Sequence, residues 1–250
     1  MIDFHAHILP KIDDGPKHLS DSLSMLKHSY EQGVGTVVST SHCYVTDEAR
    51  IDAFLAARAR SYRALREAMD SDGGPFPNIV LGAEVHLYKD ISHYENLPKL
   101  CIEGTNYLLV EMPYTKWNNT LYDSLYSMQL KHLRPILAHI ERYAAQEDAF
   151  ENLFSLDLLY QVNADSFLHS PEKRFLAKLF DKNAIQLLGS DMHNLTSRPS
   201  RMQKAAEHIG KVYGQPFLEY IQNNAEAVLE NRDVLLKSFP RLSFWDKLKL

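Results

Sequence analysis

The chain has few of the features that mark secreted, membrane-spanning or nucleic-acid-binding proteins. It contains only two cysteines, Cys43 and Cys101, which are too few for a disulfide scaffold and fit a reducing compartment. No apolar run approaches the ~20 residues of a membrane span, and no signal peptide is visible, so we expect a cytoplasmic protein without stable membrane insertion. Acidic residues outnumber basic ones, 32 against 27, which argues against a general nucleic-acid binder.

Internal repeats, low-complexity tracts and long linkers are also missing from the 250 residues. The sequence therefore predicts a single domain over residues 1–250, because α/β barrels routinely reach this length as one domain. The hydrophobic content of 45% is that of an ordinary globular protein with a large core.

Short apolar segments alternate with longer amphipathic ones. We expect strands at Met1–His7, Thr36–Ser39, Asn78–Val85, Tyr107–Glu111, Pro135–Ala138, near Asp157–Val162, and at Ile185–Gly189. We expect helices at Asp21–Gln32, Asp47–Ser71, Leu121–Lys131, Pro171–Lys182, Pro199–Val212 and Pro216–Leu236. This alternation predicts an α/β fold with a parallel sheet covered by helices, and six or seven units favour a closed or nearly closed barrel. In such barrels the chemistry lies at the carboxyl ends of the strands.

Histidines and acids stand where the predicted strands end. The candidates for metal ligands are His5, His7, Asp14, His42, Glu84, Glu111, His139, Asp191 and His193. Imidazole and carboxylate are the side chains that bind divalent metals, and the strand ends converge on one rim of a barrel. A single histidine at a strand end is more often an ordinary core or surface residue, but a ligand type at so many strand ends predicts a metal site.

The spacing of these residues supports a shared site. His5 and His7 are two residues apart on a strand and therefore face the same side, and Asp191 and His193 repeat that spacing. Gly15 suits a tight turn that directs a carboxylate of Asp13-Asp14 back toward the first pair. More than four ligands imply more than one ion, so we expect two or three ions with a carboxylate such as Glu84 as a bridge.

At this point the motifs resemble a known family. They are Asp3-Phe4-His5-Ala6-His7-Ile8-Leu9-Pro10 with Asp13-Asp14-Gly15, Thr40-Ser41-His42, Gly82-Ala83-Glu84, Val110-Glu111-Met112-Pro113, Ala138-His139-Ile140-Glu141-Arg142-Tyr143, Gly189-Ser190-Asp191-Met192-His193-Asn194 and Asn223-Asn224-Ala225-Glu226. In this order they resemble the bacterial manganese-dependent tyrosine-protein phosphatases of capsule and exopolysaccharide systems, within the polymerase and histidinol phosphatase superfamily.

The resemblance implies a distorted (β/α)7 barrel with a trinuclear metal site at its carboxyl-terminal rim. It implies one ion on His5, His7, Glu84 and Asp191, a second on Glu84, Glu111 and His139, and a third on Asp14, His42 and His193. It also implies that Arg142 holds the substrate phosphate, with Arg198 as its partner. Manganese is favoured, while iron, zinc and magnesium remain open. Departures from the family pattern at Lys11, Cys43 and Ile140 remove no ligand.

The function that follows is hydrolysis of phosphotyrosine by attack of a metal-bound hydroxide. The resemblance implies a bacterial tyrosine kinase of polysaccharide assembly as the substrate, and hence regulation of capsule or exopolysaccharide synthesis. Two alternatives stay open: a small-molecule phosphoesterase of the histidinol-phosphatase type, and a non-catalytic module that binds the kinase. Neither cysteine has an arginine six residues later, so a cysteine phosphatase is not expected.

Several residues beside these motifs have two interpretations. Arg142 could instead form a surface salt bridge with Glu141, and Arg201 could replace Arg198. The side chains of His86, Tyr88, Tyr114 and Trp117 could shape a substrate mouth or be ordinary half-buried residues. Positions 59, 62, 63 and 66 share one helical face, which is either a solvated face or a surface for an acidic partner.

Overall fold

The computed structural model describes residues 1–169, 171 and 173–241. Its strands are β1 (Ile2–Ala6), β2 (Thr36–Ser39), β3 (His42–Cys43), β4 (Asn78–Leu81), β5 (Glu84–His86), β6 (Tyr107–Glu111), β7 (Arg134–Leu137), β8 (Leu159–Asn163) and β9 (Leu187–Gly189). Its helices are α1 (Leu19–Glu31), α2 (Glu48–Asp72), η1 (Leu97–Leu100), α3 (Asn119–Leu130), η2 (Ile140–Ala149), α4 (Phe150–Phe154), α5 (Ala164–His169), α6 (Lys173–Asp181), α7 (Met202–Ile209), η3 (Gly210–Gly214) and α8 (Gln215–Leu229).

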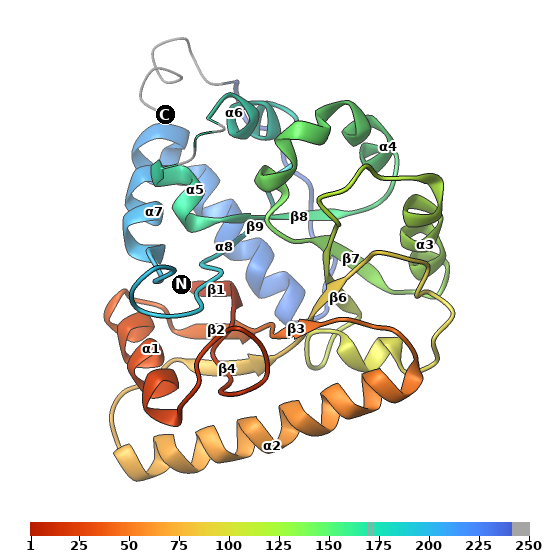
Figure 1. The fold of residues 1–250 in the computed structure, drawn as a ribbon. Coiled ribbons are helices and arrows are strands. Elements are labelled where there is room, and N and C mark those ends of the chain that lie inside the picture. Colours follow the sequence, from red (N-terminus) through yellow and green to blue (C-terminus); the bar gives the residue numbers. More distant parts are fainter. Residues whose placement is uncertain (170, 172, 242–250) are drawn as a thin grey trace.

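The strands form a curled parallel sheet, as the alternating pattern predicts (Figure 1). One part has the order β1-β2-β4 and the other the order β3-β5-β6-β7-β8-β9, and every pairing between these strands is parallel. Two hydrogen bonds join the outer strands β1 and β9: the Asp191 amide donates to the His5 carbonyl at 2.7 Å, and the His7 amide donates to the Met192 carbonyl at 2.9 Å. The carboxyl ends of the first and last strands therefore lie side by side.

The junction of β1 and β9 depends on small and polar residues. Gly189 packs so closely on β1 that a Cβ there would lie 2.5 Å from the Cβ of His5. The buried Asp3 carboxylate accepts a hydrogen bond of 2.7 Å from the Ser190 amide and so links the two strands again. Burial raises the pKa of Asp3 to about 6. These contacts fix the position of His5 relative to Asp191.

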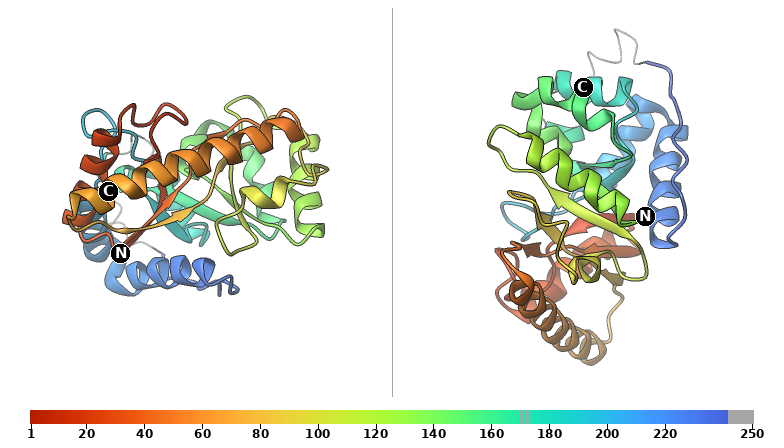
Figure 2. Two further views of the ribbon diagram at one scale, coloured as in Figure 1. Left: turned by 90° about the horizontal axis from the view of Figure 1, so that it is seen from below. Right: turned by 90° about the vertical axis from the view of Figure 1, so that its right-hand side faces the viewer.

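Helices cover the outside of the sheet (Figure 2). The long helix α2 is capped at its start by Asp47, whose carboxylate accepts from the Arg50 amide at 2.8 Å, and at its end by Gly73 in the left-handed conformation. Its buried side chains include Ile51, Phe54 and Leu65. Helix α8 contacts β1 and β9, and Figure 2 shows it on a different side of the molecule from α2.

Strands β6 and β8 are buried along their whole length, as expected in a parallel sheet that is covered on both faces. All five residues of β6 and all five of β8 are buried.

The prediction of a helix to Leu236 is wrong, because α8 ends at Leu229. Asn231 adopts φ of 53° there, and the Arg232 amide donates to the Ala227 carbonyl at 2.8 Å, which closes the helix.

Candidate metal centre

The first strand and the residue that follows it direct two imidazoles to a common point. His5 and His7 are both fully buried, and their Nε2 atoms lie 3.1 Å apart. Glu84, the first residue of β5, places its Oε2 atom 3.2 Å from each of these nitrogens. The three side chains form one compact group of metal-type ligands, drawn from strands that the sequence separates by more than 70 residues.

Glu84 is the carboxylate around which other ligands gather. Its Oε1 atom lies 2.8 Å from Nε2 of His139, and its Oε2 atom lies 2.9 Å from Nδ1 of His42. Burial alone would raise the pKa of this carboxyl, but the charge of His5 and the hydrogen bond from His139 hold it well below its usual range. An anion shared by imidazoles on several strands has the position expected of a bridging ligand.

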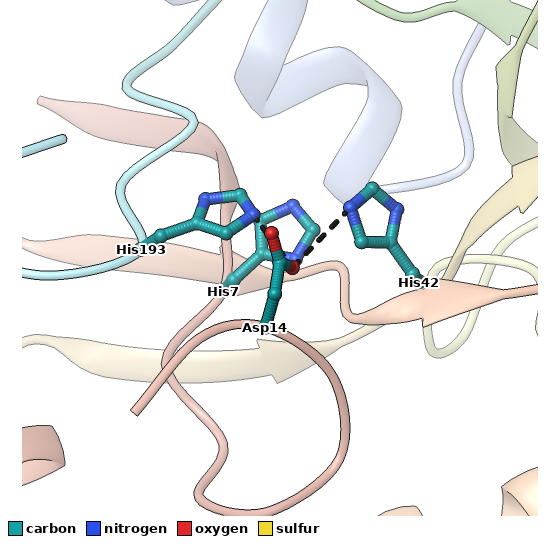
Figure 3. Close-up of side chains that lie close together, drawn as sticks. All are labelled: His7, Asp14, His42 and His193. Carbon is teal, nitrogen blue, oxygen red and sulfur yellow. Dashed lines mark ion pairs between the residues drawn. The ribbon is translucent and has the colours of Figure 1, made fainter. Parts of the chain in front are cut away.

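A second group forms where the loop after β1 meets the residues that follow β9 (Figure 3). Asp14 places Oδ1 3.1 Å from Nε2 of His193 and 3.6 Å from Nε2 of His42. The rings of His7 and His193 stack with centroids 3.8 Å apart. These four side chains are close enough to share one cation, and Asp14 is exposed, so this group faces solvent.

Glu111, the last residue of β6, closes the opposite side of the cluster. It forms a third group with His42 and Glu84, and its Oε1 atom lies 3.6 Å from Nε2 of His139. Its other oxygen lies 2.9 Å from Nδ1 of His86. His86 therefore contacts and supports a candidate ligand.

Asp191 connects the ligands to two arginines. Its Oδ1 atom lies 3.6 Å from Nε2 of His5 and 3.5 Å from Nε2 of His7. Its Oδ2 atom accepts from Arg142 at 2.5 Å and from Arg198 at 2.7 Å. Burial alone would raise the pKa of Asp191, but the charges of His5 and Arg142 hold it far below its usual range. The backbone of Asp191 has φ of 53°, a conformation that favours glycine and recurs at functional sites.

The two arginines face a small polar cavity of about 100 Å³. Arg142 and Arg198 line it together with Arg201, which forms an ion pair with Asp165 at 2.5 Å. The alternative ion pair of Arg142 with Glu141 does not occur. The buried Glu141 accepts instead from the Ser166 hydroxyl and from the backbone amide of Asn163. Arg142 and Arg198 are thus the two arginines that contact Asp191.

The donor set and its packing fit divalent metal ions. Several buried ligand atoms have no hydrogen-bond partner within the described chain: Oε2 of Glu84, Nδ1 of His42 and Nε2 of His193. The first two lie 2.9 Å apart without the geometry of a hydrogen bond. Burial lowers the pKa of His5, yet the charges of Glu84 and Asp191 outweigh it and raise that pKa to about 9. The carboxylates therefore favour positive charge at this point, as a metal site requires.

Polar residues behind the ligands fix their orientation. Asp13 accepts from Nδ1 of His7 at 2.7 Å and from the His42 amide at 2.9 Å. Gln161 places its Oε1 atom 3.0 Å from Nδ1 of His5 and accepts from the His139 amide at 2.8 Å. Partners of this kind set the tautomer and the direction of a ligating imidazole.

The roles of Gln161 and Asn163 are not predicted from the sequence. The Gln161 amide group donates to the Asn163 side chain at 2.9 Å, and Asn163 donates to Asp191 at 3.0 Å. Amide side chains give no metal-ligand signal. The one available signal is that two polar residues, two positions apart, interrupt an apolar strand and therefore face the same side.

Burial decides between the two interpretations of Trp117. Trp117 is buried, and its Nε1 donates to the Pro113 carbonyl at 2.8 Å, so it belongs to the core. Tyr114 and Tyr88 are exposed. Cys43 is buried, and burial raises the pKa of its thiol to about 12, which favours the protonated thiol of an ordinary core cysteine. No helix within the described ranges is long and apolar enough to cross a bilayer.

Fold and site define a parallel α/β protein whose strand ends carry a buried cluster of metal-type ligands beside two arginines. The chain belongs to the capsular polysaccharide synthesis CpsB/CapC family, whose profile matches residues 1–230.

Two curated relatives and one solved structure are similar to this chain over most of its length. The chain is 31% identical to the tyrosine-protein phosphatase CpsB of Streptococcus pneumoniae, over 86% of this chain and 91% of the relative. It is 28% identical to the tyrosine-protein phosphatase YwqE of Bacillus subtilis, over 94% and 93% of the two chains. The fold matches the crystal structures of YwqE and CpsB, described as metal-dependent tyrosine phosphatases, with a TM-score of 0.82, 25% identity, and coverage of 97% of this chain and 100% of the other.

Proposed function

We propose that this protein is a metal-dependent phosphatase that removes phosphate from phosphotyrosine in proteins. The observation that carries the proposal is the contact of Arg142 and Arg198 with Asp191, which itself lies beside His5 and His7. A structural metal site needs no paired guanidinium groups, whereas a phosphate dianion does. The relatives named tyrosine-protein phosphatases give the substrate class.

We further propose that three divalent ions, with manganese favoured, occupy the cluster. Their ligand sets are His5, His7, Glu84 and Asp191; Glu84, Glu111 and His139; and Asp14, His42 and His193. The three overlapping ligand groups support three ions, although they place His7 near the third set and His42 near the second. Glu84 is then the bridging ligand.

The scaffold that holds these ligands is, in this proposal, a distorted (β/α)7 barrel formed by one domain. The segments β2 and β3 count as one interrupted strand, and so do β4 and β5, because only a few residues separate each pair. The hydrogen bonds between β1 and β9 support closure of the ring.

Each group has a task that its position supports. Bound divalent ions would neutralise the charge of the phosphate dianion and acidify a water molecule. Arg142 and Arg198, at the edge of the 100 Å³ cavity, would bind the remaining phosphate oxygens and hold the phosphorus in line with the attacking water. A tyrosine leaving group has a pKa of about 10, so its departure needs less help from a proton donor than that of serine.

The biological substrate in this proposal is a tyrosine kinase of polysaccharide assembly. The family description, capsular polysaccharide synthesis, supports that setting. The protein would then regulate capsule or exopolysaccharide production. The alternatives from the sequence, a small-ester phosphatase and a non-catalytic module, receive no support from the curated relatives.

The test compares phosphate release by the manganese-loaded protein from three substrates at equal concentration: a phosphotyrosine peptide, the matching phosphoserine peptide and histidinol phosphate. We expect the phosphotyrosine peptide to give the highest kcat/KM. Preference for histidinol phosphate would replace the proposal with the small-ester alternative. If folded, metal-loaded protein releases phosphate from none of these substrates, the remaining alternative is the non-catalytic module that binds the kinase.

A further inference from the structure

A second hollow is lined in part by the loop that carries Asp14. It has a volume of about 520 Å³ and lies between this loop and one face of α2. We name it the Lys11 groove, after a residue at its edge. Its cations are Lys11 and Arg60, and its apolar side chains include Ile12, Leu19 and Ala57.

The charge of the groove contrasts with that of the protein. The chain has a net charge of −5, yet none of the described side chains that line the groove is an aspartate or glutamate. Lys11 and Arg60 are exposed, and neither forms an ion pair with any described residue. Their charges therefore remain available to an acidic partner.

The acids nearest in sequence do not neutralise these cations, because each is engaged elsewhere. Asp13 binds His7 at 2.7 Å, and Asp14 lies 3.1 Å from His193. Asp21 accepts from the His18 backbone amide at 3.1 Å, at the start of α1.

The loop backbone holds Lys11 in a conformation that has an energetic cost. Lys11 has φ of 61°, in the left-handed region that glycine adopts freely and residues with a Cβ adopt rarely. Its amide donates to the Pro16 carbonyl at 3.0 Å, and the Ser61 hydroxyl of α2 donates to the Pro10 carbonyl at 2.8 Å. The loop is thus fixed at both ends, and it presents a lysine where glycine would fit better. Such an outlier points to a role for the side chain.

The groove is within reach of a peptide bound at the metal centre. Lys11 and Asp14 are three residues apart, so their Cα atoms are at most about 11 Å from each other. An extended peptide covers about 3.3 Å per residue, so a segment about three to six residues from the phosphotyrosine would lie in the groove.

We propose that the Lys11 groove binds an acidic segment of the substrate protein that flanks the phosphotyrosine. The inference rests on the proposed phosphatase function and adds the class of sequence that the enzyme prefers. Carboxylates of the segment pair with Lys11 and Arg60, while an apolar side chain covers Ile12 and Ala57 on the groove floor. The helical face at positions 59, 62, 63 and 66, considered from sequence alone, is not the face that lines the groove.

The test uses two phosphotyrosine peptides that differ only in their flanks, glutamates in one and glutamines in the other. Exposed ion pairs contribute up to about fivefold each, so we expect wild type to prefer the glutamate peptide by about five- to tenfold in kcat/KM, and less at high salt. The variant Lys11→Gly with Arg60→Gln should reduce the ratio to about one. Lys11→Gly keeps the loop conformation, so its melting temperature should stay within a few degrees of wild type.

The matched control for the Arg60→Gln change is Arg63→Gln, which also removes one positive charge, from an exposed position on α2 outside the groove lining. It should keep the wild-type ratio. Hydrolysis of p-nitrophenyl phosphate, which has no flanks, should remain within twofold of wild type in every variant. The proposal that the groove binds an acidic segment would be overturned by a ratio of kcat/KM near one in wild type. It would also be overturned if Arg63→Gln and the groove variant lost the preference for the glutamate peptide equally. Absence of p-nitrophenyl phosphate hydrolysis by metal-loaded wild type would instead overturn the phosphatase function.

Discussion

A single methyl group at Gly189 should separate the two strands that carry His5 and Asp191. A Cβ at this position would lie 2.5 Å from the Cβ of His5, 2.8 Å from the His5 amide nitrogen and 3.0 Å from Nε2 of Gln161. Ordinary carbon contacts are about 3.5–4 Å, so β1 would have to move by about 1 Å. The two nearest atoms, the Cβ and amide nitrogen of His5, are fixed by the backbone of β1 and cannot rotate away as the end of a flexible side chain can.

The size of the effect follows from this geometry. Overpacking costs typically about 1–3 kcal/mol, and a backbone clash belongs at the upper end. For a protein of this length, about 3 kcal/mol lowers the melting temperature by about 6–12 °C. The movement also displaces His5 from Glu84, so Gly189→Ala should bind fewer metal ions per chain than wild type.

The matched control is Gly82→Ala. A Cβ at Gly82 would meet its nearest neighbours, on Ile102 and Thr40, at 3.5 Å, an ordinary contact. The assays are thermal melting with and without manganese, and metal content after dialysis. If Gly189→Ala has the same melting temperature as Gly82→Ala and retains as much metal, the argument that close packing of β9 on β1 positions the ligands is refuted.

Three further predictions concern the site and its surroundings. Arg142→Ala should lower kcat/KM for a phosphotyrosine peptide by at least about 100-fold with metal content unchanged, since a charged hydrogen bond to phosphate is lost. Steady-state kinetics measure this, and an unchanged kcat/KM would contradict the prediction. Asp13→Asn should weaken metal affinity by about 10- to 100-fold, because the partner of His7 changes, and competition with a fluorescent chelator measures it. Since burial raises the pKa of Cys43 and Cys101 to about 12 each, almost no thiolate exists at pH 8, and iodoacetamide should label them only after unfolding, as mass spectrometry can show.

The strand-end pattern carried most of the information about the fold. Continuous apolar segments that end in His, Asp or Glu predicted a parallel sheet with its ligands at one edge, and the structure has that arrangement. The pattern could not show that the second strand breaks between Ser39 and His42. It also could not show where the last helix ends, because the helix periodicity continues past Asn231, whose left-handed backbone closes the helix.

The site was predictable where a residue type is itself chemically diagnostic. Histidine and acid spacing indicated the ligands, and the family resemblance indicated Arg142. The supporting residues were not predictable, since Gln161 and Asn163 are not metal-binding types and act only through contacts across the sheet. Sequence likewise could not decide that Asp13 orients His7 while its neighbour Asp14 faces the imidazole nitrogens, because a turn of the loop separates the two roles.

The most direct test of the central claim is phosphate release from a phosphotyrosine peptide, measured for wild type and Glu84→Gln before chelation, after chelation and after return of manganese. The account predicts that wild type loses activity on chelation and regains it with manganese. Glu84→Gln should bind fewer ions and stay inactive throughout, because Glu84 contacts imidazoles on both sides of the cluster. Undiminished release by chelated wild type, or by Glu84→Gln, would contradict the account.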